Sequence, residues 1–182
     1  MFNAYLISTS KPQYFYSVIR DIILEEIKRT LESKDSFSFA VSGGSTPIGV
    51  FNLLKSNNES IDWKKIHVFS VDERCVGEEN AQNNYFNCYN AWLKHNQKIN
   101  GYRIKGWLSE EECKKDYKDK IKSIVSFKNN LPQFDLIFMG IGIDGHIASL
   151  FPCYDFENIS EDIFEKVYAK SVPSRERNQN QT

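Results

Sequence analysis

Residues 134–152 place the strongest constraint on the fold, because a long apolar run there breaks into glycines and polar residues. The run reads FDLIFMGIGI and continues as DGHIASLFP. A near-continuous apolar run suits a strand that is buried on both faces of a sheet. Ligands bind at the carboxyl ends of the strands in open α/β sheets. We therefore expect this turn to present polar groups at such an end, with a sheet and two more polar turns beside it.

The rest of the chain alternates between short apolar segments and amphipathic ones. Apolar segments predict strands at residues 3–8, 36–41 and 66–71. Amphipathic or mixed segments predict helices at residues 13–33, 48–55, 85–95 and 110–126. Asn100 and Gly101 are typical of a turn, residues 161–171 predict a short strand, and residues 172–182 carry no pattern and predict a disordered tail.

Length and composition limit the classes of partner and compartment. A chain of 182 residues predicts one domain. Its net charge of −1 gives no whole-chain electrostatic reason to expect nucleic acid or acidic membranes as partners. No apolar stretch is long enough for a membrane span, and the first residues do not resemble a signal peptide. The cysteines form no C-x-x-C pair, which favours reduced thiols in a cytoplasmic protein; they are Cys75, Cys88, Cys113 and Cys153.

The first polar turn follows the strand predicted at residues 36–41. Glycines there let the backbone approach a ligand closely, and the next helix would offer unpaired N–H groups to an anion. Pro47 suits the first turn of that helix, and the G-K-[ST] ending of a Walker loop is absent. The turn is either a phosphate site or an ordinary strand-to-helix connection. The candidate binding residues are Ser42, Gly43, Gly44, Ser45 and Thr46.

The second polar turn follows the strand predicted at residues 66–71 and contains Asp72, Glu73 and Arg74. Arg74 suits a two-pronged contact with a phosphate. Asp72 could bind substrate hydroxyls or move a proton. These charges are either a solvated loop or part of a site.

The third polar turn, residues 140–145, matches the G-x-G-x-x-G pattern of dinucleotide-binding proteins. That motif needs a long crossover helix and a second strand, whereas Pro152 follows only seven residues after Gly145. The sequence instead favours a loop shaped around Asp144 and His146, with His146 near the start of a short helix. A histidine at the carboxyl end of a strand is suited to act as a general base.

Taken together, three stretches resemble the 6-phosphogluconolactonase family. They are residues 39–47 (FAVSGGSTP), residues 68–76 (VFSVDERCV) with NNY at 83–85, and residues 140–152 (GIGIDGHIASLFP). The resemblance covers roughly residues 1–170. Glucosamine-6-phosphate deaminases share the first loop and the core around His146, but residues 148–152 look like the lactonase version.

The resemblance implies a three-layer α/β/α fold with a mainly parallel, Rossmann-like sheet. It implies hydrolysis of 6-phospho-D-glucono-1,5-lactone to 6-phospho-D-gluconate in the oxidative pentose phosphate pathway, without a metal or an organic cofactor. His146 would take a proton from the attacking water, and Asp144 would position the loop and the histidine. The loop of residues 43–46 and Arg74 would hold the substrate, mainly through its phosphate, and Asp72 would line the sugar site.

Two departures from the family leave alternatives open. Gly77 stands where the family commonly has proline, and residues 173–182 replace a basic strand and further helices. We therefore expect a phosphosugar lactonase-like domain over residues 1–171 that lacks its C-terminal part. One alternative is a truncated, non-catalytic paralogue that binds sugar phosphate or a partner. Another is a deaminase or isomerase of amino-sugar phosphates, against which the sequence after His146 argues.

Overall fold

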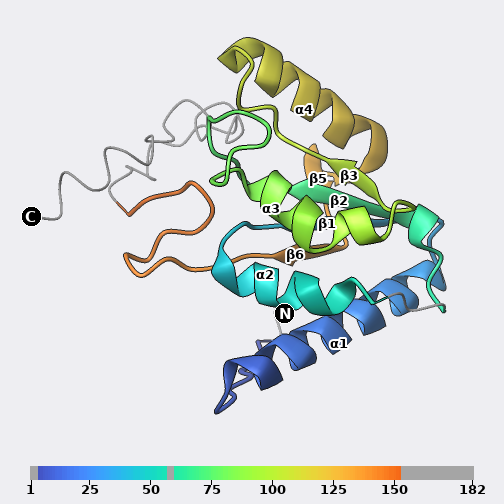
Figure 1. Ribbon diagram of the computed structural model, residues 1–182. Helices are drawn as coiled ribbons and strands as arrows, with labels where there is room; N and C mark the ends of the chain where they lie inside the picture. Colours follow the sequence, from blue (N-terminus) through green and yellow to red (C-terminus); the bar gives the residue numbers. More distant parts are fainter. Residues whose placement is uncertain (1–3, 57–59, 153–182) are drawn as a thin grey trace, which may run out of the picture.

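A four-stranded parallel sheet forms the centre of the fold (Figure 1). The computed structural model describes residues 4–56 and 60–152. All neighbouring strands of the sheet are parallel, and their order is β3-β2-β1-β6. The strands are β1 (Phe37–Val41), β2 (Ile66–Ser70), β3 (Asn100–Tyr102) and β6 (Leu136–Phe138).

Helices cover both faces of this sheet and give the predicted three layers (Figure 1). One face packs against α1 (Pro12–Leu31), α2 (Ser45–Leu54) and α3 (Asn84–Ala91), and the other against α4 (Glu110–Ile124). Short 3₁₀ helices span Trp63–Lys65 and Leu93–His95. No helix within the described residues is long and apolar enough to cross a bilayer.

The chain reverses its direction of travel across the sheet between β3 and β6. It first moves from β1 to β2 and β3 through α2 and α3, and it then returns through α4 to β6 on the other side of β1. Connections between parallel strands are right-handed, so this reversal places α4 on the opposite face from α2 and α3. The point between β1 and β6 is therefore a topological switch point, where open α/β sheets leave a crevice for ligands.

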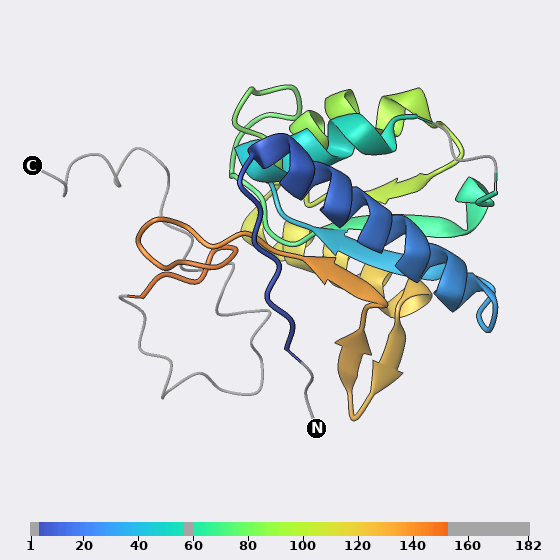
Figure 2. The same ribbon diagram turned by 90° about the horizontal axis from the view of Figure 1, so that it is seen from below.

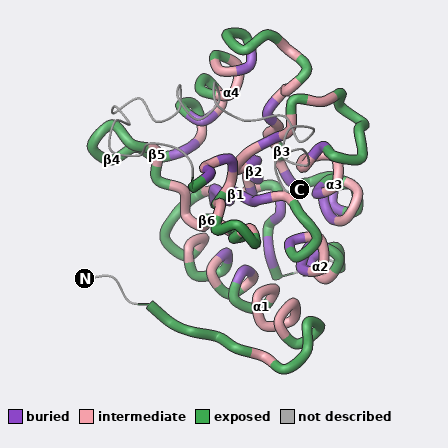
Figure 3. The backbone as a smooth tube through the Cα atoms, turned by 90° about the vertical axis from the view of Figure 1, so that its left-hand side faces the viewer, coloured by how far each residue is buried: buried purple, intermediate pink, exposed green. Residues whose placement is uncertain are grey.

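The larger core lies between the sheet and the layer of α1, α2 and α3 (Figure 3). Trp92 is fully buried at its centre, stacked on Phe51 with ring centroids 5.8 Å apart and edge-on to Phe39 at 6.3 Å. Burying each aromatic side chain of this kind contributes about 1.5–3 kcal/mol relative to exposure. This cluster fixes β1 firmly, and β1 is the strand from which the first polar turn starts.

A smaller core lies under α4. Phe69 of β2 is fully buried there and stacks on Tyr102 of β3 with centroids 4.5 Å apart. Ile121 and Val125 close this core from the α4 side. A capping box at Ser109 and Glu112 defines the start of α4.

A hairpin connects α4 to β6 and projects from the body of the protein (Figure 2). It consists of β4 (Ser126–Lys128) and β5 (Leu131–Gln133), which pair antiparallel. Its two turn residues, Asn129 and Asn130, have φ values of 53° and 62°. Two successive left-handed residues are typical of a type I′ hairpin turn, and asparagine tolerates that conformation.

The structure corrects three predictions. No strand forms in residues 4–8, and the expected turn at Asn100 and Gly101 instead begins β3. The run that includes β6 is not buried on both faces, since Ile137 is 51% exposed, and β6 lies at the edge of the described sheet. Apolar composition cannot distinguish an edge strand from a central one. The strand predicted at residues 161–171 and the tail at 172–182 lie outside the described residues.

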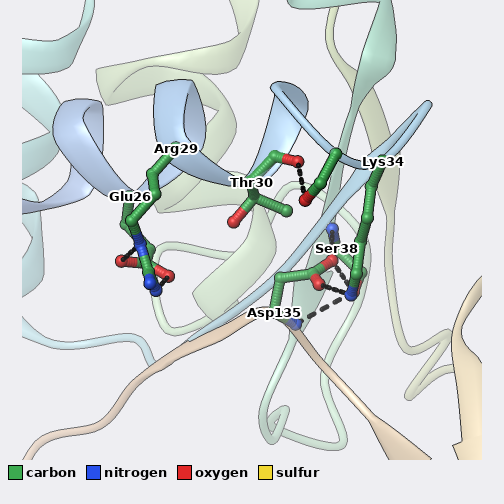
Figure 4. A network of polar contacts seen from close by, with 7 residues as sticks. Glu26, Arg29, Thr30, Lys34, Ser38 and Asp135 are labelled. Atoms are coloured by element: carbon green, nitrogen blue, oxygen red, sulfur yellow. Dashed lines mark hydrogen bonds and ion pairs between the residues drawn. The ribbon is translucent and has the colours of Figure 1, made fainter.

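Asp135, which directly precedes β6, contacts β1 and the turn that follows α1 (Figure 4). Its Oδ2 accepts hydrogen bonds from the backbone N–H and the hydroxyl of Ser38, each at 2.8 Å, and its Oδ1 contacts the Lys34 ammonium. Burial alone would raise the pKa of Asp135, but these hydrogen bonds outweigh it and lower that pKa. This contact fixes where β6 begins beside β1.

Asp135→Asn should lower the free energy of unfolding at pH 7 by about 1–3 kcal/mol, because the amide cannot accept all of these hydrogen bonds. A lowered folded-state pKa contributes stability above the unfolded pKa of about 3.9, and this contribution is lost as pH falls through the folded value. The difference between variant and wild type in urea unfolding should therefore shrink below about pH 4. Asp119→Asn, at an exposed carboxylate on α4, is the control. A deficit for Asp135→Asn that persists unchanged at pH 3 would contradict the ion-pair contribution.

Candidate functional site

Three polar turns meet at the carboxyl end of the sheet. The register pairs Val41 of β1 with Ser70 of β2 and with Phe138 of β6, so the turns after these strands start at one level. Together they surround a cavity of about 530 Å³ at that end. Figure 1 shows the loop after β6 extending beyond the sheet on the side where α2 begins. The cavity therefore lies at the switch point of the sheet.

The turn after β1 presents an open helix amino terminus to this cavity. Gly44, with φ 105°, provides the left-handed conformation that turns the chain directly into α2. Within the described residues, no side chain caps the first turn of α2, which begins at Ser45 rather than at Ile48 as predicted. The hydroxyl of Ser42 is buried beside it and has no hydrogen-bond partner among the described residues. Free N–H groups, a positive helix end and a spare hydroxyl favour an anion here.

The turn after β2 separates its three charged side chains. Asp72 and Arg74 line the cavity, whereas Glu73 is not among the lining residues and is only 8% exposed. The Nε of Arg74 is buried without a hydrogen-bond partner among the described residues. The guanidinium is therefore available to an anionic ligand.

The amino terminus of α3 is occupied, in contrast to that of α2. The carboxylate of Glu73 accepts hydrogen bonds from the backbone N–H groups of Asn84 at 2.6 Å and Tyr85 at 2.9 Å. The N-cap residue Asn83 accepts the N–H of Phe86 at 2.8 Å. An anion in the cavity therefore meets the free terminus of α2 rather than that of α3.

The turn after β6 holds a histidine beside a carboxylate. The Nδ1 atom of His146 contacts Oδ1 of Asp144, and the His146 ring lies 5.0 Å from the ring of Phe151 between centroids. The hydrogen bond from the imidazole lowers the pKa of Asp144. A carboxylate at Nδ1 favours the tautomer in which Nε2 is unprotonated. The second ring nitrogen is then able to accept a proton.

Gly142 makes room for this histidine. A Cβ atom at position 142 would lie 2.1 Å from both Nδ1 and Cε1 of His146. The Gly142 N–H donates to the carbonyl of His146 at 2.8 Å, and Gly145 turns the chain with φ 84°. The glycines therefore fold the loop back around the imidazole. A dinucleotide-binding G-x-G-x-x-G loop would have no need of such an arrangement.

The expected short helix after His146 does not form in the described residues, which end at 152. Residues 141–150 instead form a compact turn with isolated bridges between Ile141 and Ile147 and between Ile147 and Leu150. Ala148 adopts a left-handed φ of 49° within it, which a helix would not allow.

The structure brings the predicted site residues together. The cavity is lined by Ser42, Gly43, Gly44, Ser45, Thr46, Asp72, Arg74 and His146. Asp144 does not line it but contacts His146. No group of three or more His, Cys, Asp or Glu side chains within residues 4–56 and 60–152 could hold a metal ion.

Sequence reasoning missed four polar residues of the site. Gln82, Asn84 and Asn87 line the cavity from the start of α3, and the Ser149 hydroxyl donates to Oδ2 of Asp72 at 2.8 Å. The sequence did predict a helix at residues 85–95, and asparagine at position 83 is a typical N-cap residue, but no cavity role was assigned to its first turn. No sequence signal shows that this helix faces the turn after β1.

Comparisons with known proteins agree with this architecture. Residues 10–177 match the family described as glucosamine-6-phosphate isomerases/6-phosphogluconolactonase. The chain is 32% identical to 6-phosphogluconolactonase 3, chloroplastic, of Arabidopsis thaliana, over 89% of this chain and 55% of the relative. It is 35% identical to the 6-phosphogluconolactonase of Treponema pallidum, over 67% of this chain and 52% of the relative. The chain thus spans about half the length of these curated relatives.

The fold is similar to a solved structure of the same kind. The crystal structure of 6-phosphogluconolactonase from Thermotoga maritima superposes with a TM-score of 0.70 at 28% identity, covering 87% of this chain and 66% of the other. The three-layer arrangement around a parallel sheet is therefore shared with a known lactonase structure. By its sequence match over most of its length and by its fold, the chain belongs to the glucosamine-6-phosphate isomerase/6-phosphogluconolactonase family.

Proposed function

We propose that this chain hydrolyses 6-phospho-D-glucono-1,5-lactone to 6-phospho-D-gluconate. The observation that carries the proposal is the placement of an open anion site and a carboxylate-held histidine around one cavity. A phosphorylated lactone supplies both the anion and an ester carbonyl that a base-activated water can attack. The reaction would belong to the oxidative pentose phosphate pathway. We place the reaction in the cytoplasm because the cysteine pattern favours reduced thiols.

The phosphate of the substrate would bind between α2 and the turn after β2. The first-turn N–H groups of α2 and the hydroxyls of Ser42, Ser45 and Thr46 would donate to its oxygens. Arg74 would add charge-assisted hydrogen bonds, which are about twice as strong as neutral ones. Its buried Nε and the buried Ser42 hydroxyl, which lack partners among the described residues, would then be satisfied.

His146 would act as the general base. With Nδ1 held by Asp144, the unprotonated Nε2 would take a proton from a water molecule as that water attacks the lactone carbonyl. The ester C–O bond then breaks, and the ring oxygen leaves as the hydroxyl of 6-phosphogluconate after it accepts the proton that His146 took from the water. Asp72, held by Ser149, would line the sugar portion of the cavity. None of these steps calls on a metal ion or an organic cofactor.

His146→Ala should reduce the enzymatic part of lactone hydrolysis by about 10²–10⁴-fold, the usual contribution of a positioned base. The rate is measured with freshly prepared lactone, and spontaneous hydrolysis is subtracted. Binding of 6-phosphogluconate by calorimetry should remain, which separates loss of chemistry from loss of fold. His95→Ala, at an exposed histidine in the 3₁₀ helix, is the matched control. Equal rates for His146→Ala and wild type would exclude His146 as the base.

The same preparation separates this proposal from its alternatives. A non-catalytic paralogue would bind 6-phosphogluconate saturably without accelerating lactone hydrolysis. A deaminase would release ammonia from glucosamine 6-phosphate. Robust lactone turnover without ammonia release is the result expected here.

Gly142→Ala should lower kcat by about tenfold to a hundredfold, because the new methyl group would displace the His146 ring from its place. Steady-state kinetics should show this loss with little change in KM. Gly77→Ala is the control, since a Cβ there meets no atom within 4 Å and the residue does not line the cavity. If both variants retain wild-type kcat, the close packing of Gly142 on the imidazole has no catalytic consequence.

A further inference from the structure

Glu73 is the buried charge that the proposed mechanism leaves unused. It lies between Asp72 and Arg74, is 8% exposed, and does not line the cavity. Burial raises the pKa of its carboxyl group, although three backbone N–H groups act in the opposite direction. Burying a carboxyl group away from water is costly unless its oxygens are hydrogen-bonded. Both carboxylate oxygens accept hydrogen bonds from backbone N–H groups, which fix the position of the Glu73 side chain.

The contacts of Glu73 join two elements that are separate in the sequence. Oε1 accepts the N–H groups of Arg74 at 2.8 Å and Asn84 at 2.6 Å, and Oε2 accepts the N–H of Tyr85 at 2.9 Å. One carboxylate therefore ties the turn after β2 to the first turn of α3. It also places its charge at the positive end of that helix.

Asn84, whose backbone N–H is bound by Glu73, contacts the first polar turn, residues 42–46. Its Nδ2 donates to the carbonyl oxygen of Asp72 at 3.2 Å. Its side chain lies so close to Gly43 that a Cβ atom there would be 2.0 Å from the Asn84 Oδ1 and 2.2 Å from its Cγ. The loop of residues 42–46 therefore rests against a side chain whose backbone is held by Glu73.

We propose that Glu73 is a positioning residue that sets the affinity of the phosphate site. It holds Asn84 against Gly43, and Asn84 in turn fixes the loop whose N–H groups and hydroxyls receive the phosphate. This role rests on the proposed function, because it assumes that residues 42–46 bind the phosphate of the substrate. Glu73 itself touches neither substrate nor water in the reaction.

The direction in which Glu73→Gln changes phosphate affinity distinguishes a positioning role from a purely electrostatic effect of the charge. The negative charge of Glu73 lies beside an anion site, so its removal alone would leave phosphate binding unchanged or strengthen it. Loss of positioning would weaken binding instead, because the N–H groups now held by the carboxylate lose a partner and release Asn84. Glu73→Gln keeps the shape of the side chain and removes its charge, so it tests these opposite expectations.

The experiment measures binding of 6-phosphogluconate and of inorganic phosphate by calorimetry, together with lactonase kinetics, on the 182-residue chain. Glu73→Gln should raise Kd and KM by about tenfold, with kcat within about twofold, which indicates loss of uniform binding. Glu79→Gln, at an exposed carboxylate in the same loop, should change Kd by less than about twofold. Unchanged or tighter binding by Glu73→Gln would overturn the proposal.

Amide hydrogen exchange in the ligand-free protein tests the Glu73 contacts independently of the proposed function, because it requires neither ligand nor turnover. Exchange at Asn84 and Tyr85 should be slow in wild type and faster in Glu73→Gln, whether or not the protein hydrolyses lactone. Failure of wild type to bind either ligand would refute the proposed phosphate site and the affinity role together. Unchanged exchange in the variant would refute the positioning contact alone.

A second variant covers the case in which Glu73→Gln does not fold. Glu73→Asp keeps the charge but is one methylene shorter, so it cannot reach the same set of backbone N–H groups. Its Kd should also rise, while an effect of charge alone would leave it at the wild-type value. Wild-type affinity in Glu73→Asp, with faster exchange at Asn84, would likewise contradict the proposal.

Discussion

The parallel register of β1, β2 and β6 is the constraint on which the site depends. Because Val41 is level with both Ser70 and Phe138, three turns that are far apart in the sequence begin side by side. Right-handed connections send α2 and α4 to opposite faces and leave a crevice between β1 and β6. The large aromatic core beneath β1 and the Asp135 contact at the start of β6 hold this register. The packing of the interior thereby determines where the chemistry can occur.

Two helix amino termini at this end of the sheet have different roles. That of α3 is neutralised inside the protein by Glu73, whereas that of α2 has no side-chain cap. A substrate anion would thus bind at the amino terminus of α2 rather than at that of α3. The third turn supplies no helix terminus but a histidine whose orientation is set by Asp144 and whose space is made by Gly142. In the proposed function, one turn would bind the anion and another would transfer the proton, and both turns border one cavity.

The sequence allowed the prediction of features that depend on local chemistry. Helical spacing identified α1 and α4, the apolar segments identified β1 and β2, and the motifs around Arg74 and His146 identified residues that meet in the cavity. Features that depend on contacts between distant segments could not be predicted. The exposure of Ile137 depends on what packs against that face of β6, and the role of Asn84 depends on its approach to Gly43. The absence of a described helix after His146 reflects a left-handed Ala148, which composition does not indicate.

In the proposed reaction, the anion site on α2 and the histidine after β6 act on one molecule. The most direct test compares kcat/KM of the wild-type chain for 6-phosphogluconolactone and for the same lactone without its phosphate. If the phosphate is held by several charge-assisted hydrogen bonds while the carbonyl faces His146, the phosphorylated lactone should be preferred by at least about a hundredfold. Equal kcat/KM values for the two lactones would contradict the claim, because the cavity would then bind the lactone without using the anion site.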